Sequence, residues 1–377
     1  MAGIYIHIPF CKQACHYCNF HFSTQTEGIQ PFVKALLKEI ELTSVSMQNA
    51  EPISTIYFGG GTPSLLAEKD IDLILNCISK RFEMASAIEI TLEANPDDVS
   101  NDILSAWLSS GINRLSLGVQ SFVSKELAWM NRAHNAAQSL ESIENILSAG
   151  FDNFSVDLIF GSPLLTDEDL VNNINRLTSY NIPHLSCYAL TIEPNTALHH
   201  FVHKQKSAPT DSEKQARQFL LTMDLLHDAG YEQYEISNYA KPSKRSQHNS
   251  SYWEGAAYFG LGPSAHSFDG KNKRRWNVSN NQTYIKSLNE NKIPFEEEIL
   301  TTTQQANEYI MTALRKCEGI SLSIFETRFG NERLNALKGA IGQHLKNGKL
   351  IEFNNNIMLT REGKLFADGI AADLFQD

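Results

Sequence analysis

The chain has 377 residues, of which 42% are apolar and 20% charged, and its net charge at pH 7 is −11. This composition is that of a globular protein large enough for two domains, and it excludes the disordered and fibrous classes. The acidic balance argues against a nucleic-acid partner, which needs a basic face. With no secretion signal and no run of eighteen apolar residues, we expect a cytoplasmic protein.

The first expected strand, residues 4–8, leads into a loop that holds three cysteines within eight residues: Cys11, Cys15 and Cys18. Cysteine thiolates are the usual ligands of a [4Fe–4S] cube and normally number four. Three thiolates from one loop would leave one iron of the cube without a protein ligand, so that this iron could bind a small molecule. A zinc site is the first alternative, with its fourth ligand taken from His7, His16 or His21. A disulfide that leaves an odd cysteine is the second.

From residue 3 to about 235, short β-rich runs alternate with amphipathic segments. The expected strands are 4–8, 55–58, 88–93, 114–119, 154–160 and 184–191. The expected helices lie near 31–47, 67–82, 99–109, 136–149, 167–180 and 211–229. Helix ends fit this pattern, with C-terminal glycines at Gly111, Gly150 and Gly230 and a capping box from Thr166 to Asp169. The pattern predicts an α/β fold with a parallel sheet, as an open three-quarter (β/α)6 barrel.

In a parallel barrel, ligands meet the C-terminal ends of the strands. The second strand is followed by Gly59–Pro63, where missing side chains let the backbone approach a ligand closely. Polar residues follow the next strands: Glu93, Gln120, Arg132 and Asp157. A carboxylate at such a position can accept hydrogen bonds from a bound amino group or from hydroxyls.

Beyond residue 235 the alternation stops, and we expect a connecting region over 236–298 that contains the sequence His248-Asn249-Ser250-Ser251-Tyr252-Trp253. The basic run 271–276 is interpreted as a solvated loop, with porphyrin propionates or anionic lipid as the alternative partner. Residues 299–377 are expected to form a small winged-helix-like domain, with helices at 303–316 and 331–347, a hairpin over 349–360 and a last helix at 361–375. Because its second helix has few basic residues, we expect an interaction or lid role.

The spacing C-x3-C-x2-C after a strand is the signature of the radical S-adenosylmethionine (SAM) superfamily, and residues 5–11 resemble its coproporphyrinogen-oxidase-like branch. The resemblance implies the same partial barrel. It also implies that the open iron holds the amino and carboxylate groups of SAM, and that the reduced cluster splits SAM to a 5′-deoxyadenosyl radical.

The resemblance further implies a set of residues around the cofactors: Tyr5, Tyr17, Phe20, Gly60, Gly61, Thr62, Glu93, Gln120, Arg132 and Asp157. In the coproporphyrinogen enzymes this set serves two SAM molecules. There Glu93 belongs with the molecule on the cluster, and the second is bound by Thr62, Gln120, Arg132 and Asp157. Whether this chain binds one or two stays open.

The sequence HNxxYW resembles a segment linked to haem binding in the haem-chaperone branch, so His248 is the expected haem contact. Two departures from the coproporphyrinogen enzymes fit that branch: Phe20 replaces a fourth cysteine, and their N-terminal extension is missing before Tyr5. The resemblance thus implies a chaperone that passes haem to acceptor proteins, expected in the respiratory chain. The alternatives are an oxygen-independent coproporphyrinogen III oxidase and a nucleic-acid-associated radical enzyme. Productive SAM cleavage, peripheral membrane contact and a homodimer stay open.

Overall fold

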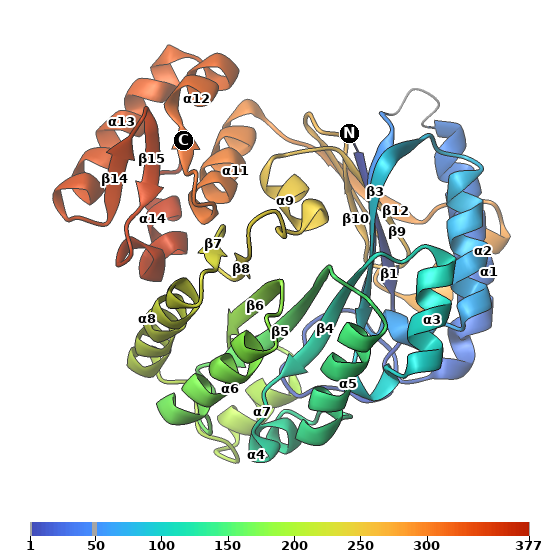
Figure 1. The fold of residues 1–377 in the computed structure, drawn as a ribbon. Coiled ribbons are helices and arrows are strands. Elements are labelled where there is room, and N and C mark those ends of the chain that lie inside the picture. Colours follow the sequence, from blue (N-terminus) through green and yellow to red (C-terminus); the bar gives the residue numbers. More distant parts are fainter. Residues whose placement is uncertain (1, 47–50, 377) are drawn as a thin grey trace.

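The computed structural model describes residues 2–46 and 51–376. The chain forms a large α/β unit and a small C-terminal unit, each with its own apolar core (Figure 1). Within these ranges, no helix combines the length and the apolar character that crossing a bilayer requires. The first helix was expected to end at residue 47, which lies outside the described residues. Residues 1 and 377, the outer limits of the expected first and last domains, also lie outside them.

Six parallel strands lie side by side in chain order at the centre of the large unit. They are β1 (Ala2–Ile8), β2 (Ile53–Gly60), β3 (Met84–Ala94), β4 (Arg114–Gln120), β5 (Phe154–Phe160) and β6 (His184–Ala189). The helices of the six units are α1 (Ile29–Ser46), α2 (Glu68–Ser79), α3 (Asn101–Ser110), α5 (Ala136–Ser148), α6 (Asp167–Ser179) and α8 (Ser212–Asp228). The six expected βα units are confirmed, and the sheet stays open instead of closing into a barrel.

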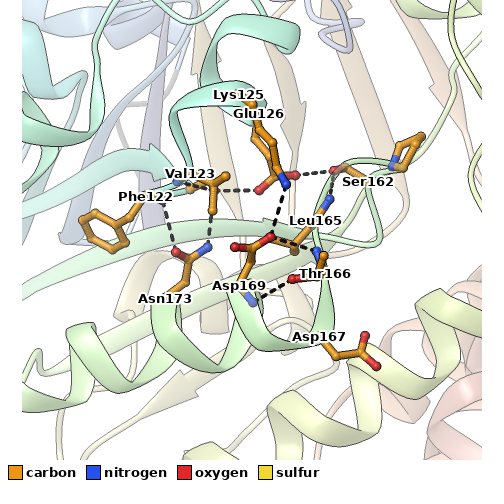
Figure 2. Close-up of polar contacts among 12 residues, drawn as sticks. Phe122, Val123, Lys125, Glu126, Ser162, Leu165, Thr166, Asp167, Asp169 and Asn173 are labelled. Carbon is orange, nitrogen blue, oxygen red and sulfur yellow. Dashed lines mark hydrogen bonds and ion pairs between the residues drawn. The ribbon is translucent and has the colours of Figure 1, made fainter.

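The loops of this unit contain short helical turns. These are η1 (Thr26–Gly28), η2 (Pro63–Leu65), η3 (Pro96–Asp98), α4 (Ser124–Trp129) and α7 (Ala197–His203). The expected helix ends are confirmed: Gly111, Gly150 and Gly230 have φ of 96°, 86° and 77°, the left-handed conformation that glycine adopts most easily. In the capping box of α6, Asp169 N donates to Thr166 Oγ1 at 3.0 Å, and Thr166 N donates to Asp169 Oδ2 at 3.1 Å (Figure 2).

A buried carboxyl group joins the loops that follow β4 and β5. Glu126 of α4 accepts hydrogen bonds from Ser121 Oγ at 2.7 Å and from Ser162 Oγ (Figure 2). Asn173 of α6 donates to Ser121 Oγ at 3.3 Å and accepts from Phe122 N at 3.3 Å. Burial raises the pKa of Glu126. Because these polar groups are buried and satisfied together, they hold both loops against α6.

The expected connecting region extends the sheet on both edges. Next to β1 lie β9 (Tyr258–Leu261), which is parallel to it, and then the antiparallel strands β10 (His266–Phe268), β11 (Lys273–Asn277) and β12 (Phe295–Ile299). Next to β6 lies β8 (Asn238–Ala240), and beyond it β7 (Glu232–Gln233), which comes just before this region in the chain. Two helices, α9 (Gln247–Trp253) and α10 (Asn281–Asn289), belong to the same region. Twelve strands of the described chain thus form one sheet.

The interpretation of 271–276 as a solvated loop is wrong for β11. Arg275 of β11 lies directly opposite Glu297 of β12. Lys273, two residues earlier on β11, forms an ion pair with the same glutamate, with Nζ 2.7 Å from Oε2. Arg274 lies opposite Glu298 on the same strand pair. Opposite charges on adjacent strands stabilise the pairing of the strands. The basic residues of β11 can therefore form a strand, although their polarity is typical of a loop.

The C-terminal unit has the helix, strand, helix, helix, hairpin order of a winged helix. Its elements are α11 (Thr302–Arg315), β13 (Ile320–Ser321), α12 (Leu322–Phe329), α13 (Asn331–Lys346), β14 (Leu350–Phe353), β15 (Asn356–Leu359), η4 (Gly363–Phe366) and α14 (Ala367–Asp373). Strand β13 and helix α12 were not predicted from the sequence, and the last helix begins later than the expected residue 361, because residues 363–366 form a 3-10 turn. Ion pairs join this unit to the large one: Arg245–Glu318, Arg315–Glu235 and Arg361–Asp224.

Candidate cofactor site and its neighbours

The cysteine loop is held against the loop that follows β2. Gly61 N donates to Ile8 O at 2.8 Å, and Thr62 N donates to Phe10 O at 2.7 Å. Phe10 is buried and packs edge-on against Phe32 of α1, with ring centroids 5.5 Å apart. These contacts fix the first residues of the loop, so the thiols that follow are presented at the C-terminal edge of the sheet.

Three thiols of this loop, all free, line a cavity of about 540 Å³: Cys11, Cys15 and Cys18. Burial raises the pKa of Cys11 to about 11 and raises that of Cys18. Thiols in such surroundings become thiolates when a cation binds, since metal binding displaces their protons. The donor set therefore fits a metal cluster that opens toward the cavity.

A single zinc ion would need four donors close together. Among the described residues, no three metal-ligand side chains come together closely enough to hold one metal ion. In a [4Fe–4S] cube each thiolate binds a different iron, so its thiols stand farther apart. The three histidines considered as zinc ligands all have backbone or side-chain partners and lie outside the cavity: His7, His16 and His21. None of these histidines is therefore placed to complete a zinc site with the thiols of the cavity.

The glycines after β2 serve packing inside the protein. A Cβ on Gly61 would lie 2.6 Å from Phe10 O and 2.8 Å from Ile8 O. A Cβ on Gly60, whose φ is 107°, would lie 2.6 Å from the ring of His7. Glycine is needed here because the backbone packs closely against β1 and the cysteine loop. We had expected it to be needed for the close approach of a ligand. Gly60, Gly61 and Thr62 nevertheless line the cavity.

Glu93, near the end of β3, lines the same cavity. Its Oε1 accepts from the Tyr57 hydroxyl at 2.8 Å, and its Oε2 accepts from Gly60 N at 3.2 Å. Burial, helped by the charge of Asp157, raises the pKa of Glu93 to about 7. Such a carboxyl group can hold a cationic or hydrogen-bond-donating ligand group in place.

Arg132 joins the cysteine loop to the ends of β3 and β4. One guanidinium nitrogen donates to Cys15 Sγ and to the Tyr17 hydroxyl, both at 3.3 Å. The other donates to Asn95 Oδ1 at 2.6 Å and to Gly118 O at 2.8 Å. A fixed positive charge therefore lies beside Cys15 Sγ.

Two more expected residues line the cavity from β4 and β5. Gln120 ends β4 with a left-handed φ of 68°, a conformation that is costly for a residue other than glycine and is concentrated at functional sites. Asp157 accepts from Ser116 Oγ at 3.5 Å, and burial raises its pKa to about 6. Tyr17 is also in the lining, and so is Phe20, whose side chain is 65% exposed.

Tyr5 and His248 do not line this cavity. Tyr5 lines a second cavity and stacks on the ring of Tyr57, with centroids 6.1 Å apart. His248 of α9 is fully buried; its Nδ1 is 2.7 Å from Thr55 Oγ1 and its Nε2 is 2.7 Å from the Tyr252 hydroxyl. Both ring nitrogens are therefore engaged, and in this geometry His248 supports its neighbours instead of facing a ligand.

Three other residues that line the cavity were not predicted from the sequence: Asn95, Ser116 and Tyr188. Asn95 follows Glu93 by two positions, and Ser116 precedes Gln120 by four, so strand alternation places each pair on one face. This alternation is the sequence signal from which Asn95 and Ser116 could have been predicted. Tyr188, one residue before the end of β6, could have been found by the same strand-end rule as Glu93.

Comparisons with known proteins agree with this geometry. Two family models match: the Radical SAM superfamily over residues 5–177 and the HemN C-terminal domain over residues 300–366. The haem chaperone HemW of Bacillus subtilis (strain 168) is 32% identical over 98% of both chains. That of Escherichia coli (strain K12) is 31% identical over 98% of this chain and 96% of the relative. The solved coproporphyrinogen III oxidase (HemN) from Escherichia coli shares the fold, with a TM-score of 0.85 and 21% identity, over 100% of this chain and 90% of that one.

Proposed function

Because this chain belongs to the HemW family of radical SAM proteins, we propose that it is a haem chaperone, which binds haem and transfers it to acceptor proteins. The observation that carries the proposal is the sequence identity to curated haem chaperones over nearly the full length of both partners. We propose haem proteins of the respiratory chain as the acceptors, and the cytoplasm, with or without peripheral contact to a membrane, as the location. The divisions near residues 235 and 298 stay predictions.

Membership of the radical SAM superfamily implies a [4Fe–4S] cluster and SAM as cofactors. In our proposal the cluster is held by the three thiols of the loop, Cys11, Cys15 and Cys18, and SAM occupies the rest of the cavity. When bound, these cofactors supply one-electron chemistry. The residues of the chain bind, orient and shield them.

Each polar residue of the cavity has a task in this proposal. Glu93 accepts hydrogen bonds from the amino group of SAM, with Tyr57 and Gly60 fixing its carboxyl oxygens. Arg132 is held by Asn95 and keeps a positive charge beside Cys15. Further polar groups in the lining are available to a second SAM molecule: Thr62, Gln120 and Asp157.

Oxygen-independent coproporphyrinogen III oxidase is the second candidate, because the chain shares the fold of that enzyme over its whole length. A similarity of fold at this identity does not carry an activity. Phe20, which stands where the family enzymes have a fourth cysteine, leaves the cavity rim apolar and exposed. We therefore place haem transfer first.

The deciding experiment compares both activities in one preparation. The cluster is reconstituted anaerobically, and the protein is titrated with haem and then mixed with apomyoglobin. We expect stoichiometric haem binding and transfer to the acceptor. In parallel, the protein is incubated with coproporphyrinogen III, SAM and a reductant, and we expect no protoporphyrinogen. If the protein formed protoporphyrinogen with catalytic turnover and transferred no haem, the chaperone proposal would be wrong and the oxidase proposal would take its place.

A further inference from the structure

A second cavity, of about 410 Å³, lies between the extended sheet and the C-terminal unit. Small-molecule sites commonly measure roughly 300–1,000 Å³. One wall consists of side chains from β1, β9, β10 and β11: Tyr5, Tyr258, His266, Phe268 and Arg274. The opposite wall comes from α9, α11 and α12, so both structural units contribute to it.

Strand pairing brings the sheet wall together. Phe268 of β10 lies opposite Tyr258 on β9 and opposite Arg274 on β11. His266, two residues before Phe268, projects from the same face of the strand. From the other wall, Tyr252 packs edge-on against Tyr258 with ring centroids 4.6 Å apart. Several aromatic faces thus line the space, which suits a flat apolar ligand.

The cavity also offers positive charge. Lys271, Arg274 and Arg328 all line it. Arg274 is neutralised by Glu308, with Nη1 2.8 Å from Oε1. Within the described part of the chain, neither Lys271 nor Arg328 has an acidic partner at ion-pair distance, and Arg328 lies 5.4 Å from the ring centroid of Tyr309. Two cations without an acidic partner, in a cavity that aromatic side chains also line, suit a flat ligand that carries two negative charges.

His266 has the properties of a free imidazole ligand. Its side chain is exposed and stacks on Trp276 at 6.1 Å. Neither of its ring nitrogens has a hydrogen-bond partner among the residues that the structure describes. Partial burial and the charge of Arg274 lower its pKa, while Glu298 opposes that effect. The imidazole is therefore neutral near pH 7, and its lone pair is available to a metal.

We propose that this second cavity is the haem site, in which His266 is an axial ligand of the haem iron and Lys271 and Arg328 face the two propionates. The identity of the ligand rests on the proposed chaperone function; the position of the site rests on the residues above. His248 is then a positioning residue, since its hydrogen bond to Tyr252 holds one aromatic wall of the cavity.

The test uses the full-length protein and two probes, ferric haem and metal-free protoporphyrin IX. Replacing His266 by Ala removes the axial ligand only, so we expect haem affinity to fall about tenfold or more, loss of the imidazole signature in the haem spectrum, and little change for protoporphyrin IX. Arg328→Gln removes a propionate partner, so both probes should bind about tenfold less tightly. His203→Ala, on the exposed face of α7, is the matched control.

The outcomes separate the two proposals. If the unmodified protein binds no haem, the chaperone function fails. If the unmodified protein binds haem, and His266→Ala keeps both the haem affinity and the imidazole signature, the chaperone function stands and the proposed site is wrong. Equal losses for haem and protoporphyrin IX in His266→Ala would also overturn the ligand assignment, because they would indicate a change of cavity shape. Unfolding curves of each variant exclude misfolding as the cause.

Discussion

The imidazole ring of His248 stacks on the ring of Tyr57, with centroids 5.0 Å apart and planes 24° from parallel. The Tyr57 hydroxyl donates to Glu93 in the first cavity, while His248 is hydrogen-bonded to Tyr252, which lines the second. The stacked pair therefore connects a residue that lines the first cavity to a residue that lines the second.

Replacing His248 by Phe keeps a ring of similar size but removes both hydrogen bonds. Thr55 and Tyr252 then lose their partner, and Thr55 is buried. We expect the free energy of unfolding to fall by about 1–3 kcal/mol, as for other lost buried hydrogen bonds. Urea unfolding measures it, with the exposed His203→Phe as the control. An unchanged stability would show that the hydrogen bonds of His248 contribute nothing.

Cys15→Ala should abolish the cluster. Three thiolates are the protein ligands in our proposal, and with two left the cube has too few. The iron-to-protein ratio and the iron–sulfur absorbance after anaerobic reconstitution measure this. Cys77→Ala is the control, because that thiol lies on α2, away from the cavity. A full cluster in Cys15→Ala would refute the ligand assignment.

Gly61→Ala tests whether backbone packing positions the cysteine loop. The new methyl group would lie 2.6 Å from Phe10 O, so the loop has to move. We expect a loss of about 1–3 kcal/mol in unfolding free energy and poor cluster incorporation. Gly339→Ala in α13 is the control: nothing lies within 4 Å of its Cβ position, and alanine favours a helix by about 0.5–1 kcal/mol. Normal cluster loading in Gly61→Ala would contradict the prediction.

Glu93 makes the stability of the cluster-free protein depend on pH. The ordinary pKa of its carboxyl group is 4.5, and burial raises it to about 7 in the folded state. Between these values the folded protein holds a proton that the unfolded chain releases, so stability falls as pH rises from about 4.5 to 7. Each pKa unit corresponds to about 1.4 kcal/mol.

Glu93→Gln removes this proton, so we expect its stability loss between pH 5 and pH 7.5 to be smaller than that of the wild type by at least about 1 kcal/mol. Urea unfolding of iron-free, SAM-free protein at both pH values measures the difference. Glu141→Gln, at an exposed position of α5, is the control. Parallel pH profiles of wild type and Glu93→Gln would show that Glu93 is ionised in both states.

Much of the fold was accessible from sequence because its signals are local. The alternation of strand and helix, the glycines that end α3, α5 and α8, and the capping box of α6 depend on neighbouring residues only. The cavity lining followed from one rule, that polar residues at the ends of parallel strands meet. That rule placed Glu93, Gln120 and Asp157 together correctly.

The features that the sequence did not predict depend on contacts between residues far apart in the chain. Strand β9 pairs with β1 across more than two hundred residues, and β11 looks like a loop until Glu297 on β12 supplies the opposite charge. His248 carries a motif, but only the fold reveals that Thr55 and Tyr252 occupy its ring nitrogens. The second cavity needs two structural units, so neither segment alone predicts it.

Strand β12 forms one edge of the sheet, and all five of its residues are exposed. A free edge is a template on which another chain can add a strand, and charged side chains are a common defence. Glu296, Glu297 and Glu298 occupy consecutive positions, so both faces of the edge carry negative charge. Two copies meeting edge to edge would bring like charges into register, which protects this open sheet from self-templated growth into aggregates.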